Sequence, residues 1–331
     1  MKKIFNGALN DIASLENLLE AWREFVRGKR YKPDVQEFVL WLMDNILALH
    51  ADLCNGMYRH GPYRHFRIAD PKPRDIHKAT VRDRLLHHAI YRVLYSFFDR
   101  TFIADSFSCR DGKGTHRAMN RFREFGYHTS YNHTRTCWVL KCDIRKFFAS
   151  IDHAALMGIL RARIPDKGII QLLGEIIGSF SSTAPGVGLP LGNLTSQLLV
   201  NIYMHEFDQF MKHTLRAKEY IRYADDFVVF SPNKMWLEAI LPEIESFLWG
   251  RLKLRLHPEK VSIKTLVSGV DFLGWVHFPD HRVLRTATKR RMLKSVAHNP
   301  KSQTIASYAG LLMHGNAWEL RRYVLEKRIE K

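Results

Sequence analysis

Apolar side chains recur at helical spacing along the first hundred residues. Between residues 11 and 27 they stand three or four positions apart, which places them on one face of a helix. The same spacing predicts a second helix at 34–50 and a longer one at about 81–98. Three prolines interrupt residues 60–77, so we expect extended strand and loop there.

The centre of the chain has a different pattern. A short apolar run at 137–144 ends in an acid, which is typical of a buried strand, and residues 218–230 form two β-rich runs around Ala-Asp-Asp, which predicts a hairpin. Further helices are expected at 153–163, 168–179, 194–213 and 235–250, strands near 260–266 and 270–278, and two or three helices over 286–329. The sequence therefore predicts an α+β fold with an antiparallel sheet in the middle and helical ends.

Charge narrows the range of partners. The 331 residues contain 51 Lys and Arg against 33 Asp and Glu, a net charge of +18. About half of it lies after residue 280, where 12 basic residues face 3 acidic ones. The electrostatic field of so many positive charges attracts polyanions, above all nucleic acid. A solvated helical surface would give the same composition and is the competing interpretation.

Cysteine usage and the first residues bear on location. The four cysteines form no metal-binding spacing and are expected to be reduced core residues of an intracellular protein. The chain contains no apolar run of about 18 residues, and its start lacks the apolar segment of a signal peptide. We expect a cytoplasmic protein without a membrane partner.

Acidic residues in apolar surroundings are the sharpest chemical feature. Asp225 and Asp226 follow each other inside the predicted hairpin, where like charges resist joint ionisation unless a divalent cation binds. An Asp-Asp pair alone is more often a surface turn. Asp143, however, ends another apolar strand, and if the two strands are neighbours the three carboxylates converge. Such a set can hold two metal ions roughly 4 Å apart for phosphoryl transfer.

The motifs around these acids resemble those of reverse transcriptases. Tyr-Ala-Asp-Asp at 223–226 and VLKCDIRKFFASIDH at 139–153 resemble the family's metal-binding motifs, and six blocks over residues 60–280 follow the family order. The resemblance implies a right-hand polymerase that copies RNA into DNA. Its expected divisions are N-terminal helices and fingers with part of the palm at 1–135, the palm with the catalytic motifs at 136–280 and a short basic helical thumb at 281–331.

The resemblance also assigns roles. Asp143, Asp225, Asp226 and the carbonyl of Ile144 would bind two Mg²⁺ ions, for which Mn²⁺ can substitute, and Lys260 would protonate the departing pyrophosphate. Nucleotide binding is expected at Lys72, Arg74, Arg145, Lys146, Phe147, Phe148, Leu191 and Gly192. Template and primer contacts are expected at Arg110, Lys113, Ser196, Gln197, Tyr223, Phe272, Leu273, Gly274 and Trp275.

Each role has a structural alternative. Arg74 would grip the triphosphate with Lys72 as a helper, and one ring of the Phe147–Phe148 pair would exclude a ribose 2′-hydroxyl. Core packing is the competing interpretation for either phenylalanine. A solvated charge is the competing one for Lys260. Gly112 and Gly114 indicate that residues 106–119, which carry Arg110 and Lys113, form a flexible loop, and a structural turn is the competing interpretation.

Two departures from the family pattern indicate a subtype. Most relatives have Gln-Gly where this chain has Leu191-Gly192, and Ser-Pro where it has Ser196-Gln197. Leucine cannot hydrogen-bond in the nucleotide pocket, so discrimination should fall. With CRDGKGTH at 109–116, the pattern resembles reverse transcriptases of diversity-generating retroelements, which copy a template RNA with errors opposite adenines. This implies dNTPs, a template RNA, an RNA/cDNA duplex and a small basic accessory protein as partners.

Other interpretations stay open. A group II intron protein is expected to continue into a longer thumb and maturase domain, and retron recognition motifs are not evident. A phage-defence reverse transcriptase, a catalytically silent RNA-binding relative and a two-metal nuclease are the remaining alternatives. The intact acids argue against the silent relative, because without metals such a cluster only destabilises a fold.

Overall fold

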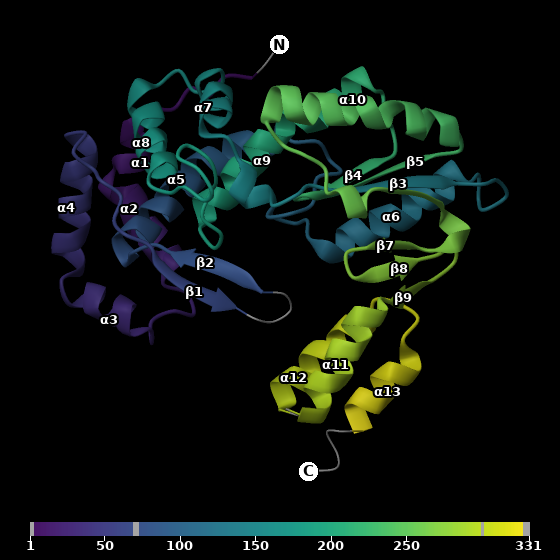
Figure 1. Cartoon of the computed structure of the whole chain (residues 1–331). Coiled ribbons are helices and arrows are strands. Elements are labelled where there is room, and N and C mark those ends of the chain that lie inside the picture. The colour runs from purple at the N-terminus through teal and green to yellow at the C-terminus, as the bar shows by residue number, and fades with distance from the viewer. Residues whose placement is uncertain (1–2, 69–72, 299–300, 327–331) are drawn as a thin grey trace. The chain divides into compact units, whose positions relative to one another are not determined.

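The computed structural model describes residues 3–68, 73–298 and 301–326 (Figure 1). The chain forms two compact units, each assembled from three stretches of sequence. The first unit contains residues 1–103, 144–210 and 244–255, and the second contains residues 104–143, 211–243 and 256–331. Helices and antiparallel sheets occur together, so the chain has the predicted α+β fold. No helix within the described residues is long and apolar enough to cross a bilayer.

The first unit is mostly helical. Its elements are α1 (Leu9–Ala13), α2 (Leu15–Phe25), α3 (Pro33–Leu40), α4 (Leu42–Cys54), β1 (Arg64–Ile68), β2 (Arg74–Lys78), α5 (Val81–Asp99), a 3₁₀ turn (Phe147–Ser150), α7 (His153–Arg161), α8 (Lys167–Gly178), α9 (Leu194–Gln209) and the second half of α10 (Lys234–Leu252). Strands β1 and β2 pair antiparallel as a two-stranded sheet.

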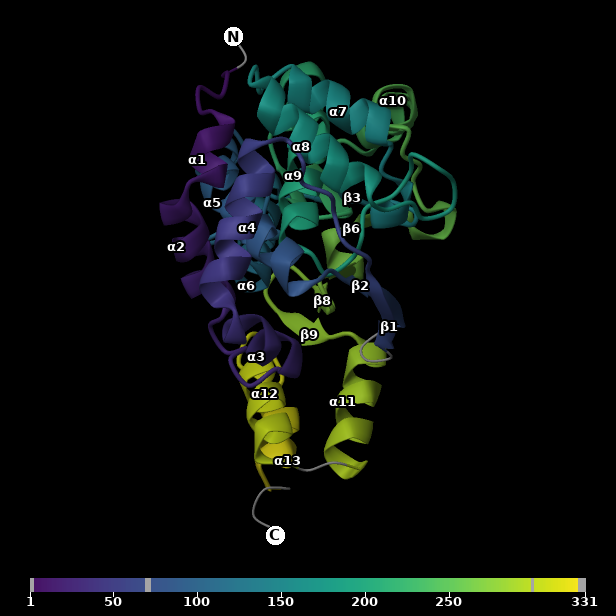
Figure 2. The same ribbon diagram turned by 90° about the vertical axis from the view of Figure 1, so that its left-hand side faces the viewer.

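Two of the predicted helices are each divided in two. The helix expected at 11–27 breaks at Ser14, whose hydroxyl accepts a hydrogen bond from the Asn17 amide and so caps α2. The helix expected at 34–50 breaks at Trp41, which has non-helical backbone angles. Helix α5 runs as one piece, and α1, α2, α4 and α5 lie side by side (Figure 2).

The second unit contains the central sheet. Its elements are α6 (Thr115–Thr129), β3 (Trp138–Asp143), most of a π-helical turn (Phe210–Thr214), β4 (Tyr220–Tyr223), β5 (Asp226–Ser231), the start of α10, a 3₁₀ turn (Pro258–Lys260), β6 (Ser262–Thr265), a second 3₁₀ turn (Leu266–Ser268), β7 (Val270–Phe272), β8 (Trp275–His277), β9 (Arg282–Leu284), α11 (Thr286–His298), α12 (Ser302–Leu312) and α13 (Trp318–Glu326). The antiparallel sheet has the order β4-β5-β3-β6.

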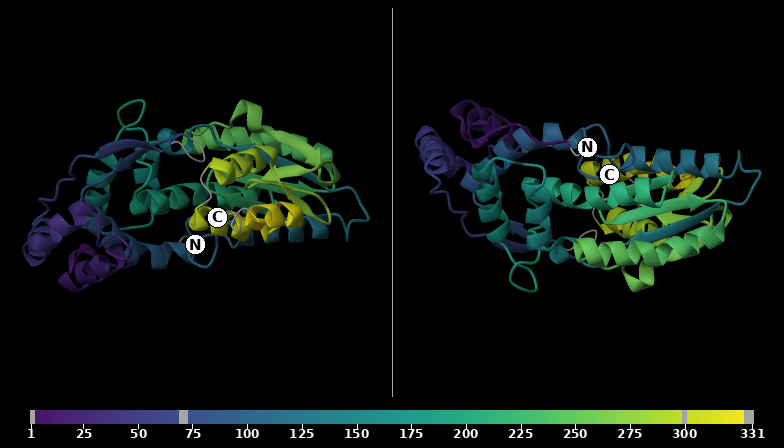
Figure 3. Two further views of the ribbon diagram at one scale, coloured as in Figure 1. Left: turned by 90° about the horizontal axis from the view of Figure 1, so that it is seen from below. Right: turned by 90° about the horizontal axis from the view of Figure 1, so that it is seen from above.

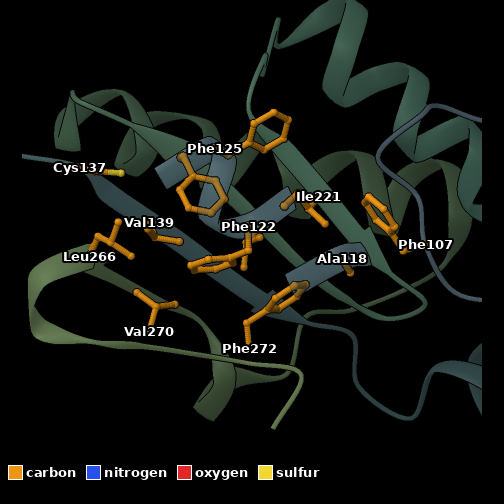
Figure 4. Close-up of a cluster of buried hydrophobic side chains, with 12 residues drawn as sticks. Phe107, Ala118, Phe122, Phe125, Cys137, Val139, Ile221, Leu266, Val270 and Phe272 are labelled. Carbon is orange, nitrogen blue, oxygen red and sulfur yellow. The ribbon is translucent and has the colours of Figure 1, made fainter. Parts of the chain in front are cut away.

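Alternation along the strands gives this sheet two buried faces. Val139, Val228 and Phe230 point to the face that α6 covers with Phe122 and Phe125 (Figure 4). Leu140, Cys142, Phe227 and Val229, one position out of phase, are also buried and belong to the opposite face. Because both faces exclude water, the pairing register is strongly specified.

Helix α6 was not expected from the sequence. The interpretation of residues 106–119 as a flexible loop is wrong from Thr115 onward, where α6 begins. Ala118, Phe122 and Phe125 have helical spacing and are buried against the sheet. The glycines that suggested a loop, Gly112 and Gly114, both have positive φ and precede the helix.

The end of the chain forms a smaller three-stranded sheet and three helices. Strands β7, β8 and β9 pair antiparallel in sequence order, and α11–α13 (yellow in Figure 3) form a compact group. Trp275 is the largest member of their shared core, with Met292, Ile305 and Leu312. A Cβ atom on Gly315 would lie 2.1 Å from the Trp275 ring, so the backbone approaches this indole closely.

Replacing Phe122 by alanine should lower the free energy of unfolding by about 3–5 kcal/mol, because the ring fills the core between α6 and the sheet. Urea denaturation measures this change. Tyr127→Ala on the exposed face of the same helix is the matched control and should change stability by about 0.5 kcal/mol or less. Equal losses for both variants would contradict this account of the core.

Candidate active site

Asp143 and Asp226 lie opposite each other on neighbouring strands. The register of β3 and β5 pairs them directly, which places their Cα atoms roughly 4.5–5.5 Å apart. Both side chains belong to the face of the sheet that carries Val139 and Val228, because each is separated from these residues by an even number of positions. The two acid-bearing strands are therefore neighbours, which is the condition for the carboxylates to converge.

The third acid lies in the turn between β4 and β5. Tyr223 pairs with Asp226, so Ala224 and Asp225 form a two-residue hairpin loop. Ala224 has φ of 55°, a left-handed conformation that is strained for a residue with a Cβ atom. The strained backbone of Ala224 therefore lies directly before Asp225, and the small side chain of Ala224 limits the strain.

A buried arginine holds this turn in place. Arg222 is fully buried, and its guanidinium donates to the carbonyl of Ala224 at 3.2 Å and to the Ser106 hydroxyl at 3.1 Å. The backbone of Arg222 also bonds to Asp105 and Phe107, which add a parallel bridge at the edge of β4. Sequence reasoning missed Arg222. An arginine within an apolar strand, three residues before the acids, was the available signal.

Burial strongly perturbs the Asp226 carboxylate. It raises the pKa of Asp226 to about 7, and the nearby charges of Asp143, Asp225 and Asp271 act in the same direction. Lys141, whose Nζ is 3.9 Å from Asp226 Oδ2, opposes this effect. Oδ1 of Asp226 is buried without a hydrogen-bond partner. A nearby cation would therefore stabilise the ionised form of the buried Asp226 carboxylate.

Two lysines stand beside the acids. Lys260 Nζ lies 2.9 Å from Asp143 Oδ1, and the amide of His257 donates to the Asp143 carbonyl at 2.7 Å. Lys141 lies two residues before Asp143 and so on the same face of β3; sequence reasoning missed it although strand alternation would have found it. Among the described residues, no three His, Cys, Asp or Glu side chains already form a cage for a metal ion.

The first unit brings several of the predicted nucleotide-binding residues together. The amide of His77 in β2 donates to the carbonyl of Leu191 at 3.2 Å, and the Asn193 side chain donates to the His77 carbonyl at 3.1 Å. Gly192 has φ of 109°, and a Cβ atom there would lie 3.0 Å from Ile76. The loop with Leu191 and Gly192 is therefore fixed against the strand that begins with Arg74.

The other residues predicted to bind nucleotide differ in exposure. Arg74, Arg145 and Lys146 are exposed, and Ile144 is buried directly after Asp143. Phe147 is 3% exposed whereas Phe148 is half-buried, so Phe148 is the ring that a sugar could reach. Lys72 lies outside the described residues.

Three of the residues predicted to contact template or primer have buried side chains. Ser196, Phe272 and Trp275 are 2%, 0% and 1% exposed, so each packs in a core and a contact with nucleic acid at these positions would have to come from the backbone. The turn between Phe272 and Trp275 stays accessible through Leu273 and Gly274, both with positive φ.

The remaining predicted contacts have structural partners of their own. Arg110 donates to the Ser106 carbonyl at 2.9 Å and Lys113 to the Ala104 carbonyl at 2.8 Å, so both shape their own loop. The Tyr223 hydroxyl lies 3.0 Å from the Thr115 hydroxyl. Gln197 is half-buried near the start of α9.

Replacing Asp226 by asparagine should stabilise the metal-free protein at pH 8, by at most about 4 kcal/mol. The folded-state pKa near 7 exceeds the unfolded value of about 3.9, so the folded state binds more protons between these values and loses stability as pH rises through them. The gain should shrink at pH 5, where Asp226 is protonated. Urea denaturation with EDTA at both pH values tests this, and a pH-independent difference would contradict the burial argument.

Comparisons with known proteins agree with this geometry. A family model described as reverse transcriptase (RNA-dependent DNA polymerase) matches residues 69–277. Protein YkfC of Escherichia coli K12 is 28% identical over 317 residues, which cover 82% of this chain and 79% of YkfC. The group II intron-encoded protein LtrA of Lactococcus lactis subsp. cremoris is 24% identical over 359 residues, which cover 86% of this chain and 57% of LtrA.

A solved structure shares the fold. The telomerase of Candida albicans, in complex with a fragment of telomeric RNA, superposes with a TM-score of 0.54 at 12% identity over 82% of this chain. The match covers 54% of the telomerase chain, so this chain spans little more than half the length of telomerase and of LtrA. The family model covers well over half of the sequence, and the chain therefore belongs to the reverse transcriptase family, the RNA-directed DNA polymerases, and is a nucleotidyltransferase.

Proposed function

We propose that this chain copies an RNA template into cDNA at a site where Asp143, Asp225 and Asp226 hold two Mg²⁺ ions, assisted by the Ile144 carbonyl. The supporting observation is the cross-strand pair of Asp143 and Asp226 with a buried, unpartnered Asp226 oxygen. Bound magnesium would activate the primer 3′-hydroxyl and stabilise the leaving pyrophosphate. Hard carboxylate oxygens suit this ion.

Lys260 has a second role in the proposal. Its ammonium group contacts Asp143 at 2.9 Å, so it stands at the edge of the carboxylate cluster. Once the acids are neutralised by cations, Lys260 is released from this ion pair and can donate a proton to pyrophosphate. Lys141 stays beside Asp226 and balances its charge.

The nucleotide pocket is assigned to the first unit. Arg74 and Lys72 would bind the triphosphate, and Arg145 and Lys146 would add positive charge. Phe148, the more exposed ring of its pair, would exclude the ribose 2′-hydroxyl. In the same scheme Arg110, Lys113, Tyr223, Gln197 and the Leu273–Gly274 turn contact template or primer, and the basic helices α11–α13 serve as a short thumb on the duplex.

For the biological role we propose mutagenic copying in a diversity-generating retroelement, with a small basic accessory protein as partner. Leu191 supports this, because its side chain offers no hydrogen bond where most relatives have glutamine, and its carbonyl is taken by His77. A pocket without that polar group discriminates less between matched and mismatched nucleotides.

An intron-derived reverse transcriptase is the second candidate. The similarity to LtrA, a group II intron-encoded protein, favours it. The neighbouring DNA separates the two roles. A near-identical repeat pair that differs at adenines, beside a small reading frame, supports the retroelement, whereas flanking intron RNA domains support the intron.

Asp225→Asn should reduce primer extension on an RNA template about a hundredfold or more, because a metal ligand loses its charge. Affinity for an RNA/DNA duplex should stay within about twofold. Incorporation of labelled dNTPs with Mg²⁺ is the measurement, and Glu238→Gln, an acid-to-amide change on α10, is the matched control. Full extension by the Asp225 variant would exclude the proposed metal site, and cleavage of the template without dNTP incorporation by the parent would identify a nuclease.

Leu191→Gln should lower the error rate opposite template adenines several-fold, because the amide restores a polar check on the base pair. Sequencing of cDNA copied from one defined RNA measures the errors by template base. Leu191→Met, which preserves size without a hydrogen bond, should keep the parent's error rate. Identical error spectra for all three proteins would remove Leu191 from the explanation.

A further inference from the structure

Two adjoining hollows lie along α6 in the second unit, with volumes of about 350 and 630 Å³. Arg123, Pro279 and Asp280 line both of them, so the hollows adjoin each other, and together they are called the groove below. Each volume lies within the roughly 300–1,000 Å³ of ligand-binding sites. None of the three catalytic aspartates lines either hollow. The groove is therefore a feature separate from the active site.

One face of α6 forms the floor of this groove. Asn120, Arg123, Glu124, Tyr127 and His128 follow each other at the three- and four-residue spacing of one helical stripe. The side of the helix with Phe122 and Phe125 packs on the sheet instead. The groove stripe is thus fixed in position by the core beneath it, while its own side chains stay accessible.

Two arginines line the groove. Arg282 donates through Nε to the His314 carbonyl and through Nη2 to Asn120 at 3.3 Å, while its Nη1 is buried without a partner. Burial and the nearby Arg123 guanidinium both lower the pKa of Arg282. Neither arginine forms an ion pair within the described part of the chain. Arg123 is exposed, so its guanidinium can bind an external anion.

Two acids also line the groove. Glu124 binds Arg121, with 2.8 Å between Oε2 and Nη1, so a cation already pairs with it. Asp280 contacts His281, with 2.7 Å between Oδ1 and Nδ1, and this contact is an ion pair only when His281 is protonated. The exposed Arg123 guanidinium therefore stays available to an external anion.

Aromatic rings accompany the cations. Phe278 and His281 stack with a ring distance of 4.8 Å and an angle of 10° between their planes, and both line the smaller hollow. Tyr127 is 43% exposed and lines the larger one, with His133 at 5.3 Å edge-on to its ring. Exposed rings offer stacking platforms for unpaired bases, and adjacent cations bind the connecting phosphates. An acidic peptide would use the cations but leave the rings without partners.

We propose that this groove along α6 binds a single-stranded segment of RNA outside the active site. Arg123 binds a phosphate, and Tyr127 and the Phe278–His281 stack receive bases. The inference rests on the proposed function only in taking RNA, the template polymer, as the ligand. The groove gives the enzyme a second binding site for that RNA, separate from the site that binds the duplex being extended.

The test uses a 20-nucleotide unstructured RNA and fluorescence anisotropy at fixed salt. The double variant Arg123→Glu with Tyr127→Ala should bind it about tenfold or more weakly than the parent. Lys264→Glu, which reverses an exposed charge on β6, and Tyr127→Phe, which keeps the ring, should each bind within about twofold of the parent. Ultraviolet crosslinking of the parent should label peptides from α6 and the 278–281 turn.

Every comparison is repeated in the Asp225→Asn background, where the groove should bind RNA with unchanged affinity even though extension is lost. RNA binding and primer extension are thus measured separately, so a wrong polymerase assignment is distinguished from a wrong assignment of the groove. Extension of a preformed RNA/DNA duplex by the double variant should stay within about twofold of the parent. Unchanged RNA affinity of the double variant overturns the inference. So does a loss of affinity for a polyglutamate peptide without a loss for RNA, which would indicate an acidic protein partner.

Discussion

The structure depends on holding two carboxylates side by side at the end of a buried sheet. The register of β3 and β5 places Asp143 opposite Asp226, and the surrounding apolar side chains raise the pKa of Asp226 to about 7. This arrangement is unfavourable for an isolated protein. Lys141 and Lys260 reduce the repulsion, and bound divalent cations would remove most of it.

The same sheet that creates this repulsion also makes the site rigid. Alternate residues of β3 and β5 pack against α6 on one face and are buried on the other, so a slip of one residue would exchange the side chains of the two packed faces and end the pairing of Asp143 with Asp226. Arg222 fixes the adjacent turn by bonding to the Ala224 carbonyl, and the strain at Ala224 is held by these contacts. The carboxylates are therefore positioned before any ligand binds, as metal-assisted phosphoryl transfer requires.

Helix α6 links the core to the proposed RNA groove. Its inner side supplies Phe122 and Phe125 to the sheet, and its outer stripe presents Arg123 and Tyr127. A polymerase that moves along its template benefits from contacts that bind backbone and bases without reading sequence. The chain's excess positive charge favours such contacts broadly.

The sequence by itself determined the α+β class, the hairpin with its acids at the turn, and most helices, because apolar periodicity and the spacing of the acids are local properties. It also determined the family, since the motifs that surround Asp143 and Asp225 are contiguous in sequence. Tertiary structure decided which of the predicted residues are accessible. Phe272, Trp275 and Ser196 share motifs with exposed neighbours, yet long-range packing buries them. Tertiary structure likewise revealed the buried Arg222 and the pairing of Arg282 with Asn120, because each depends on contacts between segments that lie far apart in the chain.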